Sequence, residues 1–230
     1  MIAFGCATTS EEEYLAHAAP SVQRVAEPDS LPLRRHGYDS IHEPYNEMLG
    51  EAAAHEDLEA VVLLHQDVSI DDPDFLAKVR MILAASPEVA VIGAAGSRKP
   101  PGLAWWEGDA SYGHLDSPLL VPGGSTFHYS DGAHEVDAVD GLLLVLSAWA
   151  ARELRFDRDL AGPLDGYDVD LCLQARARGR RVVAADFLHR HFVSYGRFFD
   201  RRRWVEADVA LRHKWALDPM PSPREAAAGI

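Results

Sequence analysis

The sequence predicts an α/β protein with a mostly parallel sheet and helices on both faces. Apolar runs of strand length, rich in Val, Leu and Ile, alternate with segments of helical pattern. Runs this continuous are typical of strands that are covered on both faces. The 230 residues suffice for one large domain with its own core. We therefore expect a single domain over residues 1–218 and a disordered Pro/Ala-rich tail over residues 219–230.

The expected elements follow from turn residues and helix caps. Strands are expected at residues 2–7, 60–64, 89–93, 136–146 and 181–187. Helices are expected at residues 10–19, 46–55, 71–86, 147–154, 165–178 and 200–215. Ser10 with Glu13 forms a capping box, Asn46 and Ser147 are further candidate caps, and Asp71-Asp72-Pro73 is a typical helix start.

Two segments lack a clear pattern. Residues 20–45 predict a loop with one short strand. Residues 94–134 are rich in Gly, Pro, Ser and Trp, and a stretch of this length without periodicity is typical of a functional loop region.

Composition excludes several classes of partner. With 36 acidic and 22 basic residues the formal charge is −14, which argues against general nucleic-acid binding and against docking on anionic lipid. A small-molecule ligand, including an anion in a local basic pocket, remains open. The apolar runs are too short to span a membrane, and no signal-peptide pattern is present. Two distant cysteines predict a reducing compartment, so we expect a cytoplasmic protein. Dinucleotide-binding and Walker A glycine signatures are absent.

The strand at 60–64 runs directly into His65-Gln66-Asp67. In open α/β sheets, ligands bind beyond the carboxyl ends of strands. Alternation places His65 and Asp67 on the same side, where an imidazole and a carboxylate can hold a divalent cation, which in turn can hold a diphosphate. The alternative is a strand end with an Asp that caps the following loop.

Further carboxylates stand at the start of the helix expected from residue 165. Asp168 and Asp170 lie two apart there, and Asp140-Gly141 offers another carboxylate beside a glycine that permits close ligand approach. The alternative is that both helix carboxylates only complement the helix dipole.

Histidines and tryptophans provide two weaker signals. His189 and His191, two apart on an extended segment, face the same way and could supply a metal ligand. The alternative is a pair of partly exposed histidines without such a role. Trp105 and Trp106 could stack on a sugar or a base, although tryptophans more often pack.

Several of these pieces occur in a recognisable order, which is Tyr45-Asn46, His65-Gln66-Asp67-Val68, Val139-Asp140-Gly141 and Tyr167-Asp168-Val169-Asp170-Leu171-Cys172. In this order they resemble the glycosyltransferase-like family named for a streptomycin-biosynthesis protein. That family is related to the family 2 glycosyltransferases with the GT-A fold. The resemblance covers residues 40–215.

The resemblance implies a GT-A-like fold, a nucleotide-diphosphate-sugar donor and a divalent metal, Mn or Mg. It implies that Asp67 is the main metal ligand and that His191, or else His189, is a later one. His65 stands where relatives carry the first Asp of Asp-x-Asp, and Tyr167 stands where they carry a Glu before the base. Asp168 matches the catalytic base.

The remaining implied roles concern the substrates. Residues implied to line the donor or acceptor site are Asn46, Gln66, Asp140, Gly141, Asp170, Trp105 and Trp106. The expected reaction is sugar transfer with inversion to a hydroxyl of an unknown acceptor. The alternative is a non-catalytic sugar-nucleotide or metal-binding module on the same fold. A nucleotidyltransferase is a weaker alternative, because residues 4–8 supply no Gly-rich nucleotide loop. Residues 195–215 could pack against a second copy in a homo-oligomer.

Overall fold

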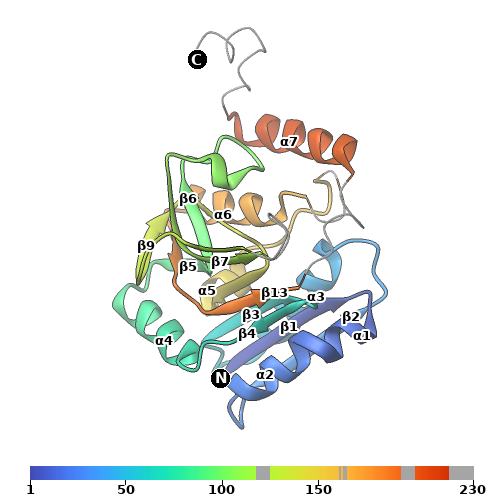
Figure 1. Ribbon diagram of the computed structural model, residues 1–230, viewed down its shortest axis with the longest axis vertical. Coiled ribbons are helices and arrows are strands. Elements are labelled where there is room, and N and C mark those ends of the chain that lie inside the picture. Colours follow the sequence, from blue (N-terminus) through green and yellow to red (C-terminus); the bar gives the residue numbers. More distant parts are fainter. Residues whose placement is uncertain (118–124, 161, 163–164, 193–199, 218–230) are drawn as a thin grey trace, which may run out of the picture.

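The computed structural model describes residues 1–117, 125–160, 162, 165–192 and 200–217 (Figure 1). Its centre is a seven-stranded sheet in the order β2-β1-β3-β11-β5-β12-β9. Its strands are β1 (Ile2–Thr8), β2 (Leu31–His36), β3 (Ala60–His65), β5 (Val89–Gly93), β9 (Ala133–Val136), β11 (Leu143–Ser147) and β12 (Arg181–Ala185). All run in one direction except β11 and β9, which are antiparallel to their neighbours. The predicted fold class is confirmed.

Two smaller antiparallel sheets flank the central one. The first has the order β10-β6-β7-β8, and the second pairs β13 with β4. Their strands are β4 (Val68–Ile70), β6 (Ala95–Arg98), β7 (Ala110–Ser117), β8 (Ser125–His128), β10 (Ala138–Val139) and β13 (His189–His191). Since β4 directly follows β3 and β13 follows β12, the small β4–β13 sheet joins two distant parts of the chain at one edge of the core.

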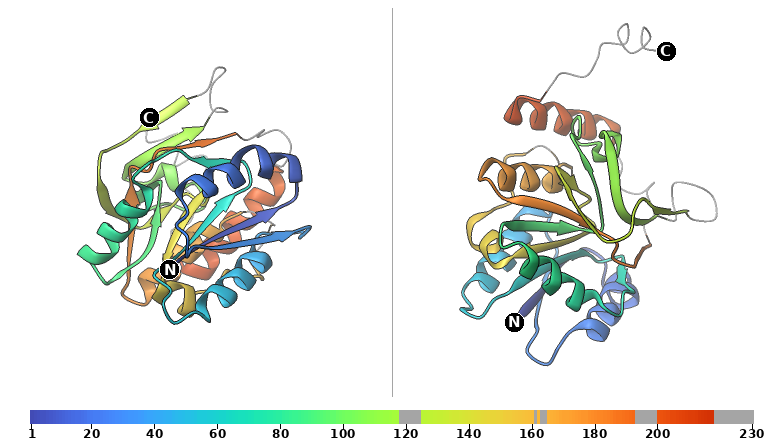
Figure 2. Two further views of the ribbon diagram at one scale, coloured as in Figure 1. Left: turned by 90° about the horizontal axis from the view of Figure 1, so that it is seen from below. Right: turned by 90° about the vertical axis from the view of Figure 1, so that its left-hand side faces the viewer.

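Helices cover both faces of the central sheet. They are α1 (Glu11–Glu13), the π-helical η1 (Tyr14–Ala18), α2 (Ala19–Val25), α3 (His42–Ala53), α4 (Phe75–Ala85), the 3-10 turn η2 (Trp105–Glu107), α5 (Ala148–Glu153), α6 (Tyr167–Ala177) and α7 (Arg201–Trp215). The consecutive segments α1, η1 and α2 share one face of the sheet with α4, and Arg80 of α4 pairs there with Glu27. The other face is covered by α3, α5 and α6 (Figure 2). The α7 helix lies above α6, at the top of Figure 1.

Three predicted helix starts follow the expected capping chemistry. Ser10 accepts a hydrogen bond from the backbone N–H of Glu13, and Ser147 accepts one from Ala150. Asp200 accepts hydrogen bonds from the first turn of α7. Side-chain oxygens at these positions satisfy backbone donors that have no partner inside the helix.

Two predicted helix starts were wrong. The α3 helix begins at His42, and Asn46 lies inside it instead of capping it. The α4 helix begins at Phe75 rather than at Asp71-Asp72-Pro73. Asp72 instead accepts a hydrogen bond from the backbone N–H of Asp74 and is paired with Lys78, so the acidic turn precedes the helix.

The prediction of an irregular loop over residues 94–134 was also wrong. This segment supplies β6, β7, β8 and the start of β9. The single strand expected over residues 136–146 is divided among β9, β10 and β11. The chain therefore leaves the central sheet after β9, adds β10 to the β10-β6-β7-β8 sheet and returns to the central sheet with β11. Asp140 and Gly141 lie in the return step, which brings them to the carboxyl end of β3.

Some expectations concern residues outside the described part. Residues 218–230 are outside it, so the predicted tail stays a prediction. Of the segment expected to pack on a second copy, residues 195–199 are outside it as well. In α7 itself, Ala207 and Leu211 are buried, while Val205 and Val209 are exposed.

Among the described residues, no helix combines the length and the apolar composition that a membrane span requires.

Candidate functional site

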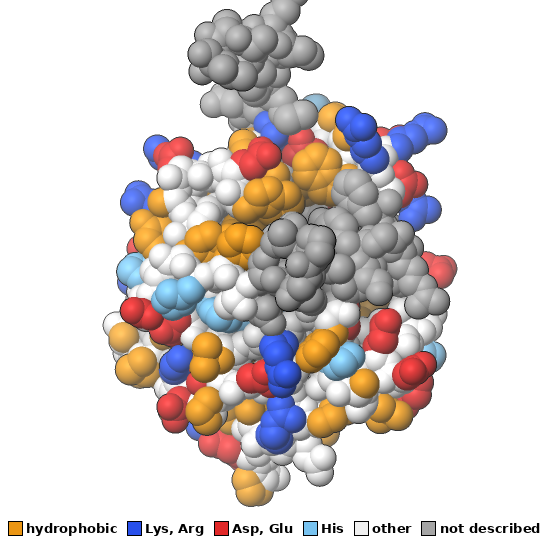
Figure 3. Space-filling model, in the orientation of Figure 1, with side chains coloured by type: hydrophobic (Ala, Val, Ile, Leu, Met, Phe, Trp, Pro, Cys, Tyr) orange, Lys and Arg blue, Asp and Glu red, His pale blue; other side chains and the backbone are white. Residues whose placement is uncertain are grey.

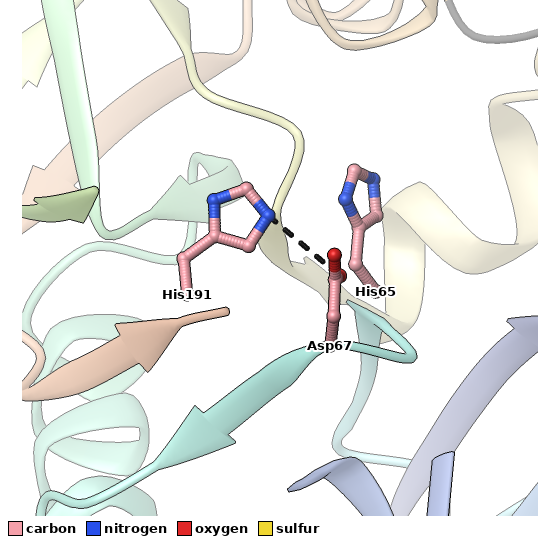
Figure 4. Close-up of side chains that lie close together, drawn as sticks. All are labelled: His65, Asp67 and His191. Atoms are coloured by element: carbon pink, nitrogen blue, oxygen red, sulfur yellow. Dashed lines mark ion pairs between the residues drawn. The ribbon is translucent and has the colours of Figure 1, made fainter. Parts of the chain in front are cut away.

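A cluster of His65, Asp67 and His191 lies at the carboxyl end of β3 (Figure 4). One ligand atom from each residue lies within 4.8 Å of the others. His65 ends β3, Asp67 lies in the turn before β4, and His191 ends β13. The pairing of β13 with β4 brings the third residue to the first two, and the N–H of Phe192 donates to the carbonyl of Asp67 at 2.9 Å. The fold thus brings together His65 and Asp67, which the strand end predicted, and His191, which the separate histidine pair predicted.

The geometry of this cluster fits a divalent cation. Nε2 of His191 is buried and has no hydrogen-bond partner among the described residues. Its neighbour is Oδ1 of Asp67, which at 3.6 Å is beyond hydrogen-bond distance. A buried polar nitrogen without a hydrogen bond is costly, and coordination of an ion between the two residues would satisfy it. Two imidazoles and a carboxylate are ligands that divalent metals accept.

The third residue of the cluster, His65, has a hydrogen-bond partner of its own. Nε2 of His65 lies 2.7 Å from the hydroxyl of Tyr167, the first residue of α6. Figure 4 shows another ring nitrogen of His65 facing the side where Asp67 and His191 lie. The sequence singled out Tyr167 only as a departure from the family pattern, and its contact with His65 was missed.

Burial and neighbouring charge set the protonation of this cluster. Burial lowers the pKa of His65, which keeps its imidazole neutral and able to offer a lone pair. Burial alone would raise the pKa of Asp67, but the imidazoles of His191 and His65 outweigh it and hold that pKa below its ordinary value. A neutral imidazole beside an ionised carboxylate is the state that binds metal.

The carboxylate of Asp168 lies one residue beyond Tyr167. Its Oδ2 accepts a hydrogen bond from the backbone N–H of Gly141 at 2.9 Å, and its Oδ1 accepts one from Val169. Burial, and after it the charge of Asp140, raises the pKa of Asp168 to about 7. A carboxyl group with such a pKa can exchange protons near neutral pH.

Asp140 is held by two donors. The indole N–H of Trp105 donates to its Oδ2 at 3.0 Å, and the backbone N–H of Leu142 donates to its Oδ1. Trp105 is only 2% exposed, so it positions Asp140 and cannot stack on a ligand as the sequence suggested. Trp106 packs edge-on against Trp105 and is 49% exposed, which leaves its ring available for stacking.

Four residues of the predicted site lie in other surroundings. His189 is 2% exposed, packs against His114 and is absent from the three-residue cluster; burial lowers its pKa to about 4. Asn46 exchanges two hydrogen bonds with the backbone of Phe156. These contacts favour packing roles for both residues.

The other two also have protein partners. The side chain of Gln66 accepts from the backbone of Thr9 and Ser10 and donates to Glu13, so it ties the end of β3 to the start of the first helix. Asp170 is fully buried and accepts hydrogen bonds from α6 and α7. Both contacts favour roles in positioning elements.

The fold and the site together define a GT-A glycosyltransferase architecture with a candidate metal site. Residues 7–206 match the model of a family described as "Glycosyltransferase like family", and the chain belongs to that family. The chain is also 26% identical over 225 residues to the streptomycin biosynthesis protein StrF of Streptomyces griseus, covering 97% of this chain and 78% of that protein.

A solved structure shares the fold. The mannosyltransferase PcManGT of Pyrobaculum calidifontis, in complex with GDP-Man and Mn²⁺, superimposes with a TM-score of 0.59 at 14% identity. The match covers 96% of this chain and 66% of the mannosyltransferase chain. At this identity the likeness establishes the fold.

Proposed function

We propose that this protein transfers a sugar from a nucleotide-diphosphate-sugar donor to a hydroxyl of an acceptor, with inversion at the anomeric carbon. The observation that carries the proposal is the convergence of two groups at the carboxyl end of β3. His65, Asp67 and His191 form a candidate metal site there, and Asp168 lies next to the tyrosine that contacts His65. Membership of the glycosyltransferase-like family supports this assignment.

His65, Asp67 and His191 would hold the metal, Mn or Mg. When bound, such an ion supplies positive charge that offsets the charge growing on the leaving nucleoside diphosphate. The donor set contains two imidazoles, which suit transition metals better than Mg²⁺, and this favours Mn²⁺. The GDP-Man and Mn²⁺ bound to the mannosyltransferase support a nucleotide-sugar donor and this choice of metal.

Asp168 is the proposed general base. It is partly exposed, and in its ionised form it can take the proton from the acceptor hydroxyl as that hydroxyl attacks the anomeric carbon. The N–H groups of Gly141 and Val169 fix the direction of the carboxylate before the substrate arrives. A single direct displacement of the nucleoside diphosphate by the acceptor hydroxyl, assisted by one base, inverts the configuration at the anomeric carbon.

The acceptor and the sugar are proposed to lie beside Asp140, Gly141 and Trp106. A band of apolar side chains crosses the upper half of the face in Figure 3, over the region of β6, β7 and α7. The exposed ring of Trp106 belongs to η2, which is the next element after β6 along the chain. An apolar ring of this kind stacks well on the face of a sugar. We place the reaction in the cytoplasm, since Cys6 and Cys172 are both free thiols.

Replacement of the base tests the proposal. Asp168→Asn keeps the shape of the side chain but cannot accept a proton, so transfer should fall by about 100- to 10,000-fold while donor binding changes little. Calorimetry with nucleoside diphosphates and Mn²⁺ measures binding, and product formation from a panel of nucleotide sugars measures transfer. The exposed Asp159→Asn is the matched control and should leave both unchanged. If Asp168→Asn turned over substrate as fast as the native chain, the assignment of Asp168 as the base would be refuted.

A non-catalytic sugar-nucleotide or metal-binding module is the second candidate. The observation that favours it is that both oxygens of Asp168 already accept backbone hydrogen bonds. Titration of nucleoside diphosphates with and without Mn²⁺, followed by an assay of donor hydrolysis, separates the two candidates. Binding without hydrolysis or transfer supports the module.

A further inference from the structure

We propose that Tyr167 is a positioning residue, which holds His65 in the ring orientation and tautomer that a metal ligand needs. The inference rests on the metal site of the proposed function and assigns a role to a residue that does not reach the ion itself. It starts from the short contact of 2.7 Å between the Tyr167 hydroxyl and Nε2 of His65.

A histidine has two ring nitrogens, and only an unprotonated one can bind a metal. Metal-binding histidines usually donate the N–H of the other nitrogen to an acceptor, which fixes both tautomer and orientation. The Tyr167 hydroxyl oxygen can accept the N–H of Nε2, which leaves Nδ1 of His65 with its lone pair. The nitrogen of His65 on the side of Asp67 and His191 in Figure 4 is in place to use that lone pair.

The position of the Tyr167 hydroxyl is fixed by its surroundings. The side chain is 3% exposed and its ring packs against those of Tyr45, Phe156 and His42. Its hydroxyl occupies the space beside Gly141 that a Cβ would fill. Gly141 was expected to permit close approach of a ligand, whereas the group that approaches it is this hydroxyl.

The same contact links the metal site to the proposed base. Tyr167 and Asp168 are consecutive at the start of α6, and Gly141 accommodates the hydroxyl of the first and donates its N–H to the second. The start of α6 therefore positions two groups together: the Tyr167 hydroxyl, which contacts His65, and the proposed base Asp168. The tyrosine hydroxyl at position 167 makes this pairing with His65 possible.

The test compares two buried tyrosines that touch each other. Tyr167→Phe removes the hydroxyl that contacts His65. Tyr45→Phe removes a hydroxyl that is equally buried and has no hydrogen-bond partner among the described residues. Mn²⁺ affinity is measured without nucleotide, by calorimetry and by electron paramagnetic resonance of the free ion. Loss of such a partner typically weakens metal binding by about 10- to 100-fold, so we expect this loss in Tyr167→Phe and unchanged affinity in Tyr45→Phe.

A second readout reports the tautomer directly. Nitrogen NMR of ¹⁵N-histidine-labelled protein, with the His65 signals assigned through His65→Gln, should show Nε2 protonated in the native chain and a changed tautomer population in Tyr167→Phe. Gly141→Ala is the second variant, because it keeps the hydroxyl but displaces it, and it should also weaken Mn²⁺ binding. Thermal unfolding identifies any variant that does not fold.

The outcomes separate this inference from the proposed function. Equal Mn²⁺ affinity in the native chain, Tyr167→Phe and Tyr45→Phe overturns the positioning role. An equal loss in both tyrosine variants overturns it too, because packing alone would then explain the effect. Absence of sugar transfer from a chain that binds Mn²⁺ and shows the expected difference counts only against the transferase.

Discussion

At the scale of single residues, Asp168 has the property that most directly predicts behaviour in solution. Its raised pKa, about 7, results from burial and from the nearby charge of Asp140. As a base it must be ionised, so transfer should decline as pH falls below about 7 and level off above it. The measurement is a pH–rate profile at saturating Mn²⁺, with metal occupancy recorded at each pH.

Occupancy is the necessary control, because protonation of the histidine ligands releases metal at low pH. Asp140→Asn removes the second cause of the raised pKa and should move the decline to lower pH. A rate that stays constant through pH 7 while metal remains bound would contradict the role of Asp168. The same raised pKa affects stability, because a folded state that keeps the proton loses stability as pH rises through the folded pKa.

Single residues also show what a sequence reveals of a site. His65, Asp67 and His191 could be found because strand ends and alternation place polar groups at a sheet edge. The contact of Tyr167 could not, because it depends on the space beside Gly141. His189 and Asp170 carry the right chemistry in sequence, but burial against other residues is a tertiary property that spacing does not disclose.

At the scale of elements, continuous apolar runs identified the strands of the core, since burial on both faces leaves a clear pattern. The strands β6, β7 and β8 were missed because none contains a continuous apolar run. The β6 and β8 strands have only four residues each, and Gly, Ser, His and Asp interrupt the apolar positions of the eight-residue β7. Residues 136–146 were expected to form one strand, but Asp137 and Asp140-Gly141 interrupt the apolar residues at the two places where the chain changes sheet.

The tie between α6 and α7 predicts a measurable stability. Asp170 is fully buried and accepts from the indole of Trp215 and from Lys214 and Gln174. Asp170→Ala leaves these donors without their acceptor, and we expect it to lower the free energy of unfolding by about 2–3 kcal/mol. Lys214 is one-third exposed and also pairs with Asp157, which limits the cost. Urea unfolding measures the change.

Glu206→Ala provides the comparison on the same helix. Glu206 pairs with Arg202 on the exposed side of α7, and because solvent screens an exposed pair, its loss should lower the free energy of unfolding far less than Asp170→Ala does. If the Asp170 and Glu206 variants lost equal stability, the buried carboxylate would not be what holds α7 to α6.

At the scale of the whole molecule, the residues of the candidate metal site come from both halves of the chain. A ligand that binds only the folded state stabilises all of it, by about 2.7 kcal/mol at a concentration 100 times its Kd. For a chain of this size we expect Mn²⁺ at that excess to raise Tm by roughly 5–10 °C. Calorimetric or fluorescence melting with and without Mn²⁺ measures the shift.

The shift should vanish in His191→Ala and persist in His213→Ala, which removes an exposed histidine on α7. The quantity to compare is the change in Tm that Mn²⁺ causes in each variant. This difference does not contain the effect of the substitution on the Tm of the metal-free protein. A native chain whose Tm ignores Mn²⁺ at any concentration would rule out the metal site.

The pairing of β4 with β13 has a consequence for how the protein is made. On a ribosome, His65 and Asp67 emerge early, whereas His191 emerges only after most of the core strands. A nascent chain without β13 therefore carries two of the three candidate ligands and would not close the proposed site around an ion. Loading of the proposed metal site would thus follow translation, and a product truncated before β13 would lack one of the three candidate ligands, however much manganese the cell contains.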